Sequence, residues 1–148
     1  MKVDIGGGRS PQPGHVNLDP IHGQGDWKRP VQDGIPAADG TVDAVFASHV
    51  MEHIPAGQER IDVCNEIWRV LKPGGTFEIR VPLLVTPDGK THWEAVADPT
   101  HVSFWTMQSF QYLSGDLSAD ADYGLERWRL ERTSVRDGWE GQAVLTKP

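Results

Sequence analysis

A strand–helix–strand pattern in the middle of the sequence constrains the fold more than any other feature. "TVDAVFAS" (41–48) and "GTFEIRVP" (75–82) predict two strands, the second with apolar and polar residues in alternation. Between them, residues 57–71 repeat apolar side chains every three or four positions, which predicts a helix that ends at "KPGG". Strands that alternate with a helix predict a parallel sheet with crossover connections, and hence an α/β fold.

Shorter elements are predicted on both sides of this unit. We expect short strands over residues 2–5, 15–19 and 29–32. After the unit we expect a long loop (83–105), a helix (106–115) with Thr106 as its cap, a polar connection (114–122) and a closing hairpin (123–135 and 139–148). In the central helix, the predicted apolar stripe is Ile61, Cys64, Trp68 and Leu71, and Met51 and Trp68 are expected in the core.

Length and composition narrow the class of protein. A chain of 148 residues predicts one domain, residues 1–148, with a sizeable core. The single cysteine, Cys64, excludes an internal disulfide and suits a reducing cytoplasm. No apolar run reaches the roughly 20 residues of a membrane span, so we expect no membrane association. The formal charge of −7 argues against nucleic-acid binding without a partner.

The glycine loop near the start predicts a nucleoside-binding site. "KVDIGGG" is followed, after the seven residues Arg9 to His15, by "VNLDP". Glycines at a strand end let a ligand approach the backbone closely, and Asp19 can accept hydrogen bonds from a ribose diol. On these residues alone, the ligand is either a dinucleotide or an adenosyl compound.

Two details favour the adenosyl compound. A pyrophosphate binds at the N-terminus of a following helix, and the short loop with Pro11, Pro13 and Gly14 leaves no room for a full helix. Asp19 also follows Gly6 by thirteen residues, whereas the dinucleotide fingerprint places its acid about 20 residues on. A nicotinamide dehydrogenase is therefore disfavoured, and S-adenosylmethionine (SAM) is favoured.

The order of four motifs resembles the class I SAM-dependent methyltransferases. The motifs are "VDIGGG", "VNLDP", "DGIPAADGTVDAVFASHVMEHI" and "EIWRVLKPGGTFEIRVP". They look most like the small, N-terminally truncated branch in which "GxxxxPGxxNxD" replaces the first helix, and they cover residues 2–82. The resemblance implies a Rossmann-like, mostly parallel sheet of order 3-2-1-4-5-7-6 with an antiparallel C-terminal hairpin strand. It also implies SAM as cofactor and S-adenosylhomocysteine (SAH) as product.

The resemblance also implies a set of cofactor-binding residues. These are Asp4, Gly6, Gly7, Gly8, Asp19, Pro20, Val31, Gln32, Ser48 and His49. The first four would surround the methionine part and Asp19 would bind the ribose. Pro20 and the backbone of Val31 and Gln32 would meet the adenine, and Ser48 and His49 would lie under the sulfonium. The sequence departs from the pattern at Val31, where many relatives have an acid, and at Ser10, where they have a glycine.

The candidate catalytic residues are His101 and His49. His101 follows "DPT" in the 83–105 loop, which we interpret as a lid and substrate segment, and a neutral imidazole there can accept a proton or hold an acceptor. The alternative is a purely structural histidine. We expect Glu52 and His53 to tether the start of the helix; the alternative is that they act on a substrate. The spacing of His92, Asp98 and His101 matches no metal signature, so we predict no metal.

The sequence thus predicts a methyltransferase that acts on an oxygen, nitrogen or carbon nucleophile and does not identify the acceptor. The alternative is a SAM-binding or degenerate, non-catalytic interaction module, which the departures at Ser10 and Val31 favour. Because the sequence begins at the first predicted strand, we expect the lid, a second copy of the chain or a partner to cover the cofactor.

Overall fold

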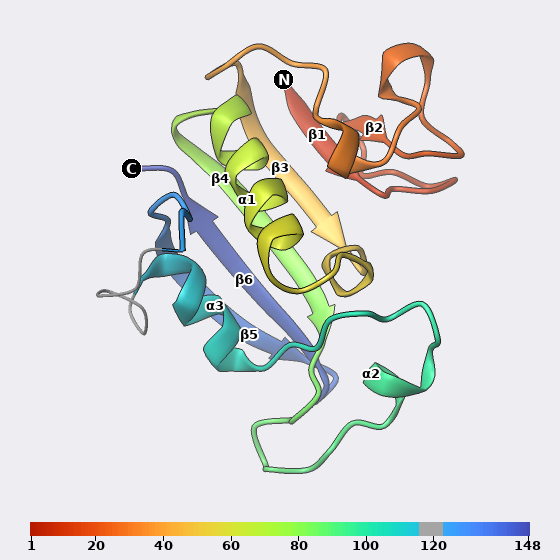
Figure 1. The fold of residues 1–148 in the computed structure, drawn as a ribbon, viewed down its shortest axis with the longest axis vertical. Helices are drawn as coiled ribbons and strands as arrows, with labels where there is room; N and C mark the ends of the chain where they lie inside the picture. Colours follow the sequence, from red (N-terminus) through yellow and green to blue (C-terminus); the bar gives the residue numbers. More distant parts are fainter. Residues whose placement is uncertain (116–122) are drawn as a thin grey trace.

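One six-stranded sheet organises the protein. The computed structural model describes residues 1–115 and 123–148 (Figure 1). The strands are β1 (Lys2–Ile5), β2 (Val16–Leu18), β3 (Val42–Ser48), β4 (Leu71–Pro82), β5 (Arg129–Arg136) and β6 (Glu140–Thr146), in the order β2-β1-β3-β4-β6-β5. The first four strands are parallel to one another, whereas β6 is antiparallel to both β4 and β5. This confirms the mostly parallel sheet with an antiparallel C-terminal hairpin.

The two predicted helices are present, and four shorter helical turns accompany them. The α-helices are α1 (Gln58–Val70), α2 (Glu94–Ala97) and α3 (Met107–Ser114), and the 3-10 turns are η1 (Gly25–Trp27), η2 (Val31–Asp33) and η3 (Met51–His53). Thr106 precedes α3 as expected, and its backbone N–H donates to Ser109 Oγ at 3.0 Å. Among the described residues, no helix combines the length and hydropathy needed to cross a bilayer.

The strand predicted over residues 29–32 is wrong. Pro30 has no N–H to donate to a neighbouring strand, and the N–H groups of Asp33 and Gly34 turn back to the carbonyls of Pro30 and Val31 at 3.1 and 3.0 Å. This closes the 3-10 turn η2 in place of a strand. The described sheet therefore has the order implied by the resemblance without its third strand, and β2 forms an edge.

The closing hairpin is shorter than predicted. Its first strand, β5, begins at Arg129 rather than at residue 123. The predicted polar connection (114–122) lies largely outside the described residues, which omit 116–122.

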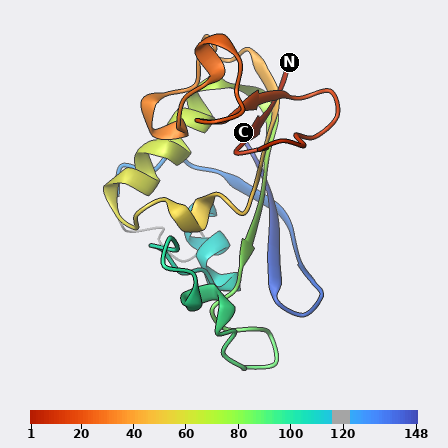
Figure 2. The ribbon, with the colours of Figure 1, turned by 90° about the vertical axis from the view of Figure 1, so that its right-hand side faces the viewer.

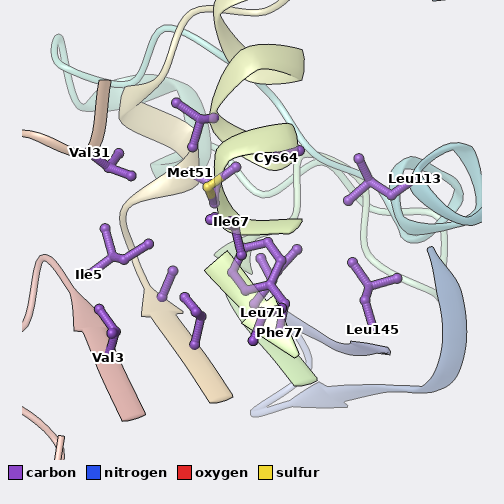
Figure 3. Close-up of a cluster of buried hydrophobic side chains, with 14 of the residues drawn as sticks. Val3, Ile5, Val31, Met51, Cys64, Ile67, Leu71, Phe77, Leu113 and Leu145 are labelled. Atoms are coloured by element: carbon purple, nitrogen blue, oxygen red, sulfur yellow. The ribbon is translucent and has the colours of Figure 1, made fainter. Parts of the chain in front are cut away.

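One face of the sheet is apolar, and the helices cover it. Val3, Val45, Phe77 and Leu145 pair in register across β1, β3, β4 and β6, and each is at most 1% exposed. Figure 2 shows α1 and α3 on this side of the sheet, and Figure 3 shows the side chains that fill the space between. The residues that alternate with this row face the other way.

The opposite face of the sheet is polar, and it stays uncovered by helices of the described residues (Figure 2). A second row runs through Asp4, Phe46, Glu78 and Val144. Phe46 is shielded on this face by Arg80, whose guanidinium carbon lies 4.8 Å from the ring centroid. A sheet that is wet on one side explains why the sequence of β4 alternates and is not continuously apolar.

Helix α1 packs on the apolar face with a slightly different stripe from the predicted one. Its buried residues are Val63, Cys64, Ile67 and Val70, while Trp68 packs partly buried against the core and Ile61 is half-buried. Met51 is fully buried, which confirms its place in the core. Burial raises the pKa of the Cys64 thiol to about 12, so this thiol is neutral and inert in the folded protein.

We predict that Phe77→Ala destabilises the protein by about 3–5 kcal/mol, because it leaves a cavity in the central apolar row. The matched control is Phe104→Ala, since Phe104 is 48% exposed, and we expect its free energy of unfolding to change by no more than about 0.5 kcal/mol. Urea unfolding measures both. Equal effects of the two substitutions would show that the row does not organise the core.

Candidate functional site

The carboxyl ends of β1, β2 and β3 meet at one edge of the sheet. Ile5 pairs with Leu18 and with Ala47, so the residues that follow these three strands start side by side. Gly6 has a φ of 68°, and a Cβ atom there would collide with Cγ2 of Val50. The glycine loop therefore touches the segment after β3 directly. In an open α/β sheet this edge is where ligands bind.

Two carboxylates hold the glycine loop in place. Asp4 Oδ2 accepts the N–H of Gln12 at 2.7 Å. Asp19 Oδ2 accepts the N–H of Gly8 at 3.1 Å, and its Oδ1 accepts those of Ile21 and His22 at 2.8 and 2.6 Å. Both carboxylates are therefore scaffolding of the loop as well as candidate ligand-binding groups.

Their pKa values move in opposite directions. Burial raises the pKa of Asp4, and the hydrogen bond from Gln12 offsets this only in part. Burial also acts to raise the pKa of Asp19, but hydrogen bonds from the backbone of His22, Ile21 and Gly8 together lower it below its usual value. Asp19 is therefore ionised at neutral pH and carries a negative charge to the strand end.

The bonds already made by Asp19 limit what it can offer a ribose. A carboxylate has about four acceptor positions, and backbone N–H groups occupy three of those of Asp19 in this structure. About one acceptor position is left for a ribose hydroxyl. Hydrogen bonds to both hydroxyls of a ribose diol would therefore require one of the three backbone hydrogen bonds to break. Asp19 is 7% exposed, which leaves a narrow approach.

A cavity of about 860 Å³ begins at the glycine loop. Gly8, Asn17, His22 and Trp27 are among its lining residues, so it follows β2 along the edge of the sheet. Its volume lies within the range of roughly 300–1,000 Å³ for small-molecule sites.

The three residues predicted at the adenine lie on turns outside this cavity's lining. The Val31 side chain is buried among core residues near Ile5, as Figure 3 shows, so only its backbone can meet a ligand. Gln32 is exposed, and its Nε2 donates to Glu59 Oε1 at 3.3 Å. Pro20 is exposed beside Asp19. Gln32 is thus engaged with α1, although it remains at the surface.

His49 lies between two carboxylates just after β3. Its Nε2 is 2.8 Å from Glu140 Oε2 and its Nδ1 is 3.3 Å from Glu52 Oε1. The Glu52 contact and then that of Glu140 raise the pKa of His49, against the effect of burial. Its φ of 55° places it in the left-handed region, which non-glycine residues favour only where the surroundings impose it. Sequence reasoning missed Glu140, because no local pattern connects residues 91 positions apart.

The 83–105 segment is anchored at its base. Leu83 and Trp105 form a bridge, and the Leu84 N–H donates to the Trp105 carbonyl at 2.7 Å. The Glu52 carbonyl accepts the N–H groups of Val102 and Ser103 at 2.9 and 3.1 Å. Glu52 was expected to tether the start of the helix; its backbone carbonyl holds the 83–105 segment, and its side chain lies 3.3 Å from His49.

His101 keeps one member of the triplet considered from the sequence as a neighbour, since its Nε2 is 3.7 Å from Asp98 Oδ2, but His92 lies elsewhere. His101 Nδ1 is 2.9 Å from the Ala95 carbonyl, the His101 ring packs edge-on against His53 with centroids 4.9 Å apart, and the side chain is 11% exposed. His92 instead stacks on Trp139 with ring centroids 5.1 Å apart. The structure thus groups His101 with η3.

The sequence of this chain and its fold are both similar to those of known methyltransferases. Residues 24–79 match the model of a methyltransferase domain family. No curated protein sequence matches the chain significantly.

Solved methyltransferase structures share the whole fold. A SAM-dependent methyltransferase from Archaeoglobus fulgidus is 13% identical with a TM-score of 0.66, over 99% of this chain and 85% of that one. One from Aquifex aeolicus is 13% identical with a TM-score of 0.64, over 99% and 81%. The Haloferax volcanii protein solved with the Trm112 methyltransferase activator is 17% identical with a TM-score of 0.63, over 99% and 82%. At these identities the likeness shows the fold, and with the family match it supports SAM as the cofactor.

We predict that Gly6→Ala destabilises the protein by at least about 1 kcal/mol more than Gly14→Ala. Both glycines have positive φ, 68° and 76°, so both substitutions strain the backbone, but only the first meets another side chain. Thermal or urea unfolding measures the difference. In a Val50→Ala background the two substitutions should become equivalent, and a persistent excess for Gly6→Ala would contradict the contact.

Proposed function

We propose that this chain, which has the fold of the class I SAM-dependent methyltransferases, transfers a methyl group from SAM to an oxygen, nitrogen or carbon nucleophile. In this reaction the acceptor forms a bond to the methyl carbon as the bond to the sulfonium sulfur breaks, and SAH is the product. Alignment of donor and acceptor can account for several kcal/mol of the barrier. Only an acceptor that holds its proton tightly at neutral pH needs a base.

The observation that carries the proposal is the strand edge where the glycine loop, Asp19 and His49 converge. The loop can receive the methionine part of SAM, and the remaining acceptor position of Asp19 can bind the ribose. Ser48 ends β3 and His49 follows it, at the strand end that would lie under the sulfonium. Val31 and Gln32 would contribute backbone groups to the adenine, with Pro20 beside it. Together with Asp4, these are the cofactor-binding residues of the proposal.

The acceptor would reach the methyl group past the 83–105 segment. His101 is the proposed catalytic residue there, because a neutral imidazole can accept a proton from a bound acceptor or hold it in line. His49 is the second candidate. Its two flanking carboxylates give the site an excess of negative groups, which suits a cationic sulfonium.

Two further elements belong to the proposal. A second copy or a partner protein would complete the cover of the cofactor, and the activator complex of the Haloferax volcanii relative supports this. A cytoplasmic location is expected from the single cysteine. The alternative function, a SAM-binding interaction module, makes the same binding predictions but no methyl transfer to any acceptor.

We predict that SAM and SAH bind and that NAD binds at least tenfold more weakly, a difference of about 1.4 kcal/mol. Asp19→Ala should weaken SAM binding by roughly 1.5–3 kcal/mol, because it removes a ribose bond and releases the glycine loop. Titration calorimetry measures these affinities. Asp26→Ala is the control, since it removes an exposed acid of η1, and it should bind SAM normally. Tighter binding of NAD, or an unaffected Asp19→Ala, would overturn the assignment of the cofactor.

We also predict that amide hydrogen exchange in residues 83–105 slows when SAH binds. The segment is anchored at Leu83 and Trp105 but is exposed along much of its length, so ordering over a ligand would suppress local opening. The paired residues Thr76 and Thr146, at the opposite end of β4 and β6 from Pro82 and Glu140, should keep their exchange rates. Protection of the glycine loop with no change in residues 83–105 would argue against a lid.

A further inference from the structure

Three potential metal ligands from two segments meet beside the proposed acceptor site. Glu52 and His53 come from η3, and His101 comes from the segment after α2. One ligand atom from each lies within 4.8 Å of the others. Each of these residue types binds zinc and other first-row divalent ions.

The Glu52 carboxylate lacks the hydrogen bonds that a buried charge requires. Its side chain is 1% exposed, and neither oxygen has a hydrogen-bond partner among residues 1–115 and 123–148. His49 Nδ1 is 3.3 Å from Oε1, near enough for an ion pair but outside the geometry of a hydrogen bond. Burying an ionised carboxylate without such partners is costly, so each case calls for an explanation.

Both histidines are already oriented as metal ligands are. His53 Nδ1 is 3.1 Å from the Thr100 carbonyl, and His101 Nδ1 is 2.9 Å from the Ala95 carbonyl. A carbonyl only accepts hydrogen bonds, so each Nδ1 carries the proton and each Nε2 presents a lone pair. Histidine ligands in metal sites commonly donate their second nitrogen to a backbone carbonyl in this way.

We propose that Glu52, His53 and His101 form a binding site for Zn²⁺ or a similar first-row divalent ion. The sequence led us to expect no metal, on the spacing of His92, Asp98 and His101; the proposal rests on a different set of residues. Ligand atoms about 2.0–2.1 Å from a tetrahedral zinc lie roughly 3.3 Å apart, so the group closes by at most about 1.5 Å. His53 is exposed and can make this movement.

The ligand set also indicates what the ion does. Two histidines and one glutamate leave a fourth position open, as in catalytic zinc sites. If the proposed methyl transfer holds, this position binds the heteroatom of the acceptor and lowers its pKa. His101 then acts as a ligand in place of a base. Asp98, whose Oδ2 is 3.7 Å from His101 Nε2, is the competing partner in the metal-free state.

The test is zinc binding to the chelator-treated protein, measured by titration calorimetry and metal analysis. We expect one Zn²⁺ per chain, a rise in melting temperature with Zn²⁺, and affinity at least about 100-fold weaker in Glu52→Gln and His101→Asn. His15→Asn is the control, because His15 is remote from the cluster in the sequence and its Nδ1 is bonded locally to Pro13, and it should bind zinc normally. Glu52→Gln removes a buried charge whose oxygens lack hydrogen-bond partners and which has only the ion-pair contact with His49, so its metal-free form should melt no earlier than the native chain.

Two results would overturn the proposal: no stoichiometric zinc binding, or equal binding by the native chain, Glu52→Gln and His101→Asn. SAH affinity measured on the same samples separates this outcome from a failure of the methyltransferase assignment. If SAH binds and zinc does not, the cofactor site stands and the metal site falls.

Discussion

The protein depends on one apolar row that crosses the sheet through Val3, Val45, Phe77 and Leu145. These side chains lie on the face of the sheet that α1 and α3 cover (Figure 2), and each is in register with its neighbours on the adjacent strands. A slip of one residue in any strand would turn its apolar side chains to water, so burial of the row fixes the register of the whole sheet. Hydrophobic burial on one face therefore specifies the fold.

Fixing the register also fixes the site. Once β1, β2 and β3 are aligned, the glycine loop, Asp19 and His49 must emerge at the same edge. The polar groups then stabilise the loops that the strands bring together: Asp4 and Asp19 accept backbone N–H groups, and Glu140 reaches His49 from the hairpin. The groups proposed to bind a cofactor thus also hold the loops.

Local pattern predicted the parts of the fold that local physics decides. Alternation in residues 75–82 and the three- to four-residue apolar repeat in 57–71 reflect burial of one face, and both elements are present. The strand over 29–32 failed because a β-like composition does not reveal that Pro30 and the following N–H groups close a turn. Strand propensity does not indicate whether the backbone of a short segment will hydrogen-bond to a neighbouring strand or within its own turn.

The site was predictable only where its residues follow a strand or a glycine run. Asp19 and His49 carry that signal. Glu140 and the meeting of Glu52 with His101 do not, because those contacts join segments distant in sequence and arise from the tertiary fold. The three hydrogen bonds that Asp19 accepts from the backbone could not be predicted from the sequence either, since they depend on the path of the glycine loop.

The proposed binding place of the adenosyl cofactor is the strand edge at the glycine loop, and not the polar face of the sheet. Backbone amide shifts in a ¹⁵N NMR titration with SAH distinguish the two most directly. We predict the largest shifts at Gly7, Gly8, His22 and His49, with the β5 and β6 residues Arg132 and Val144 unaffected. Shifts centred on Arg132 and Val144, with an unchanged glycine loop, would contradict this proposal.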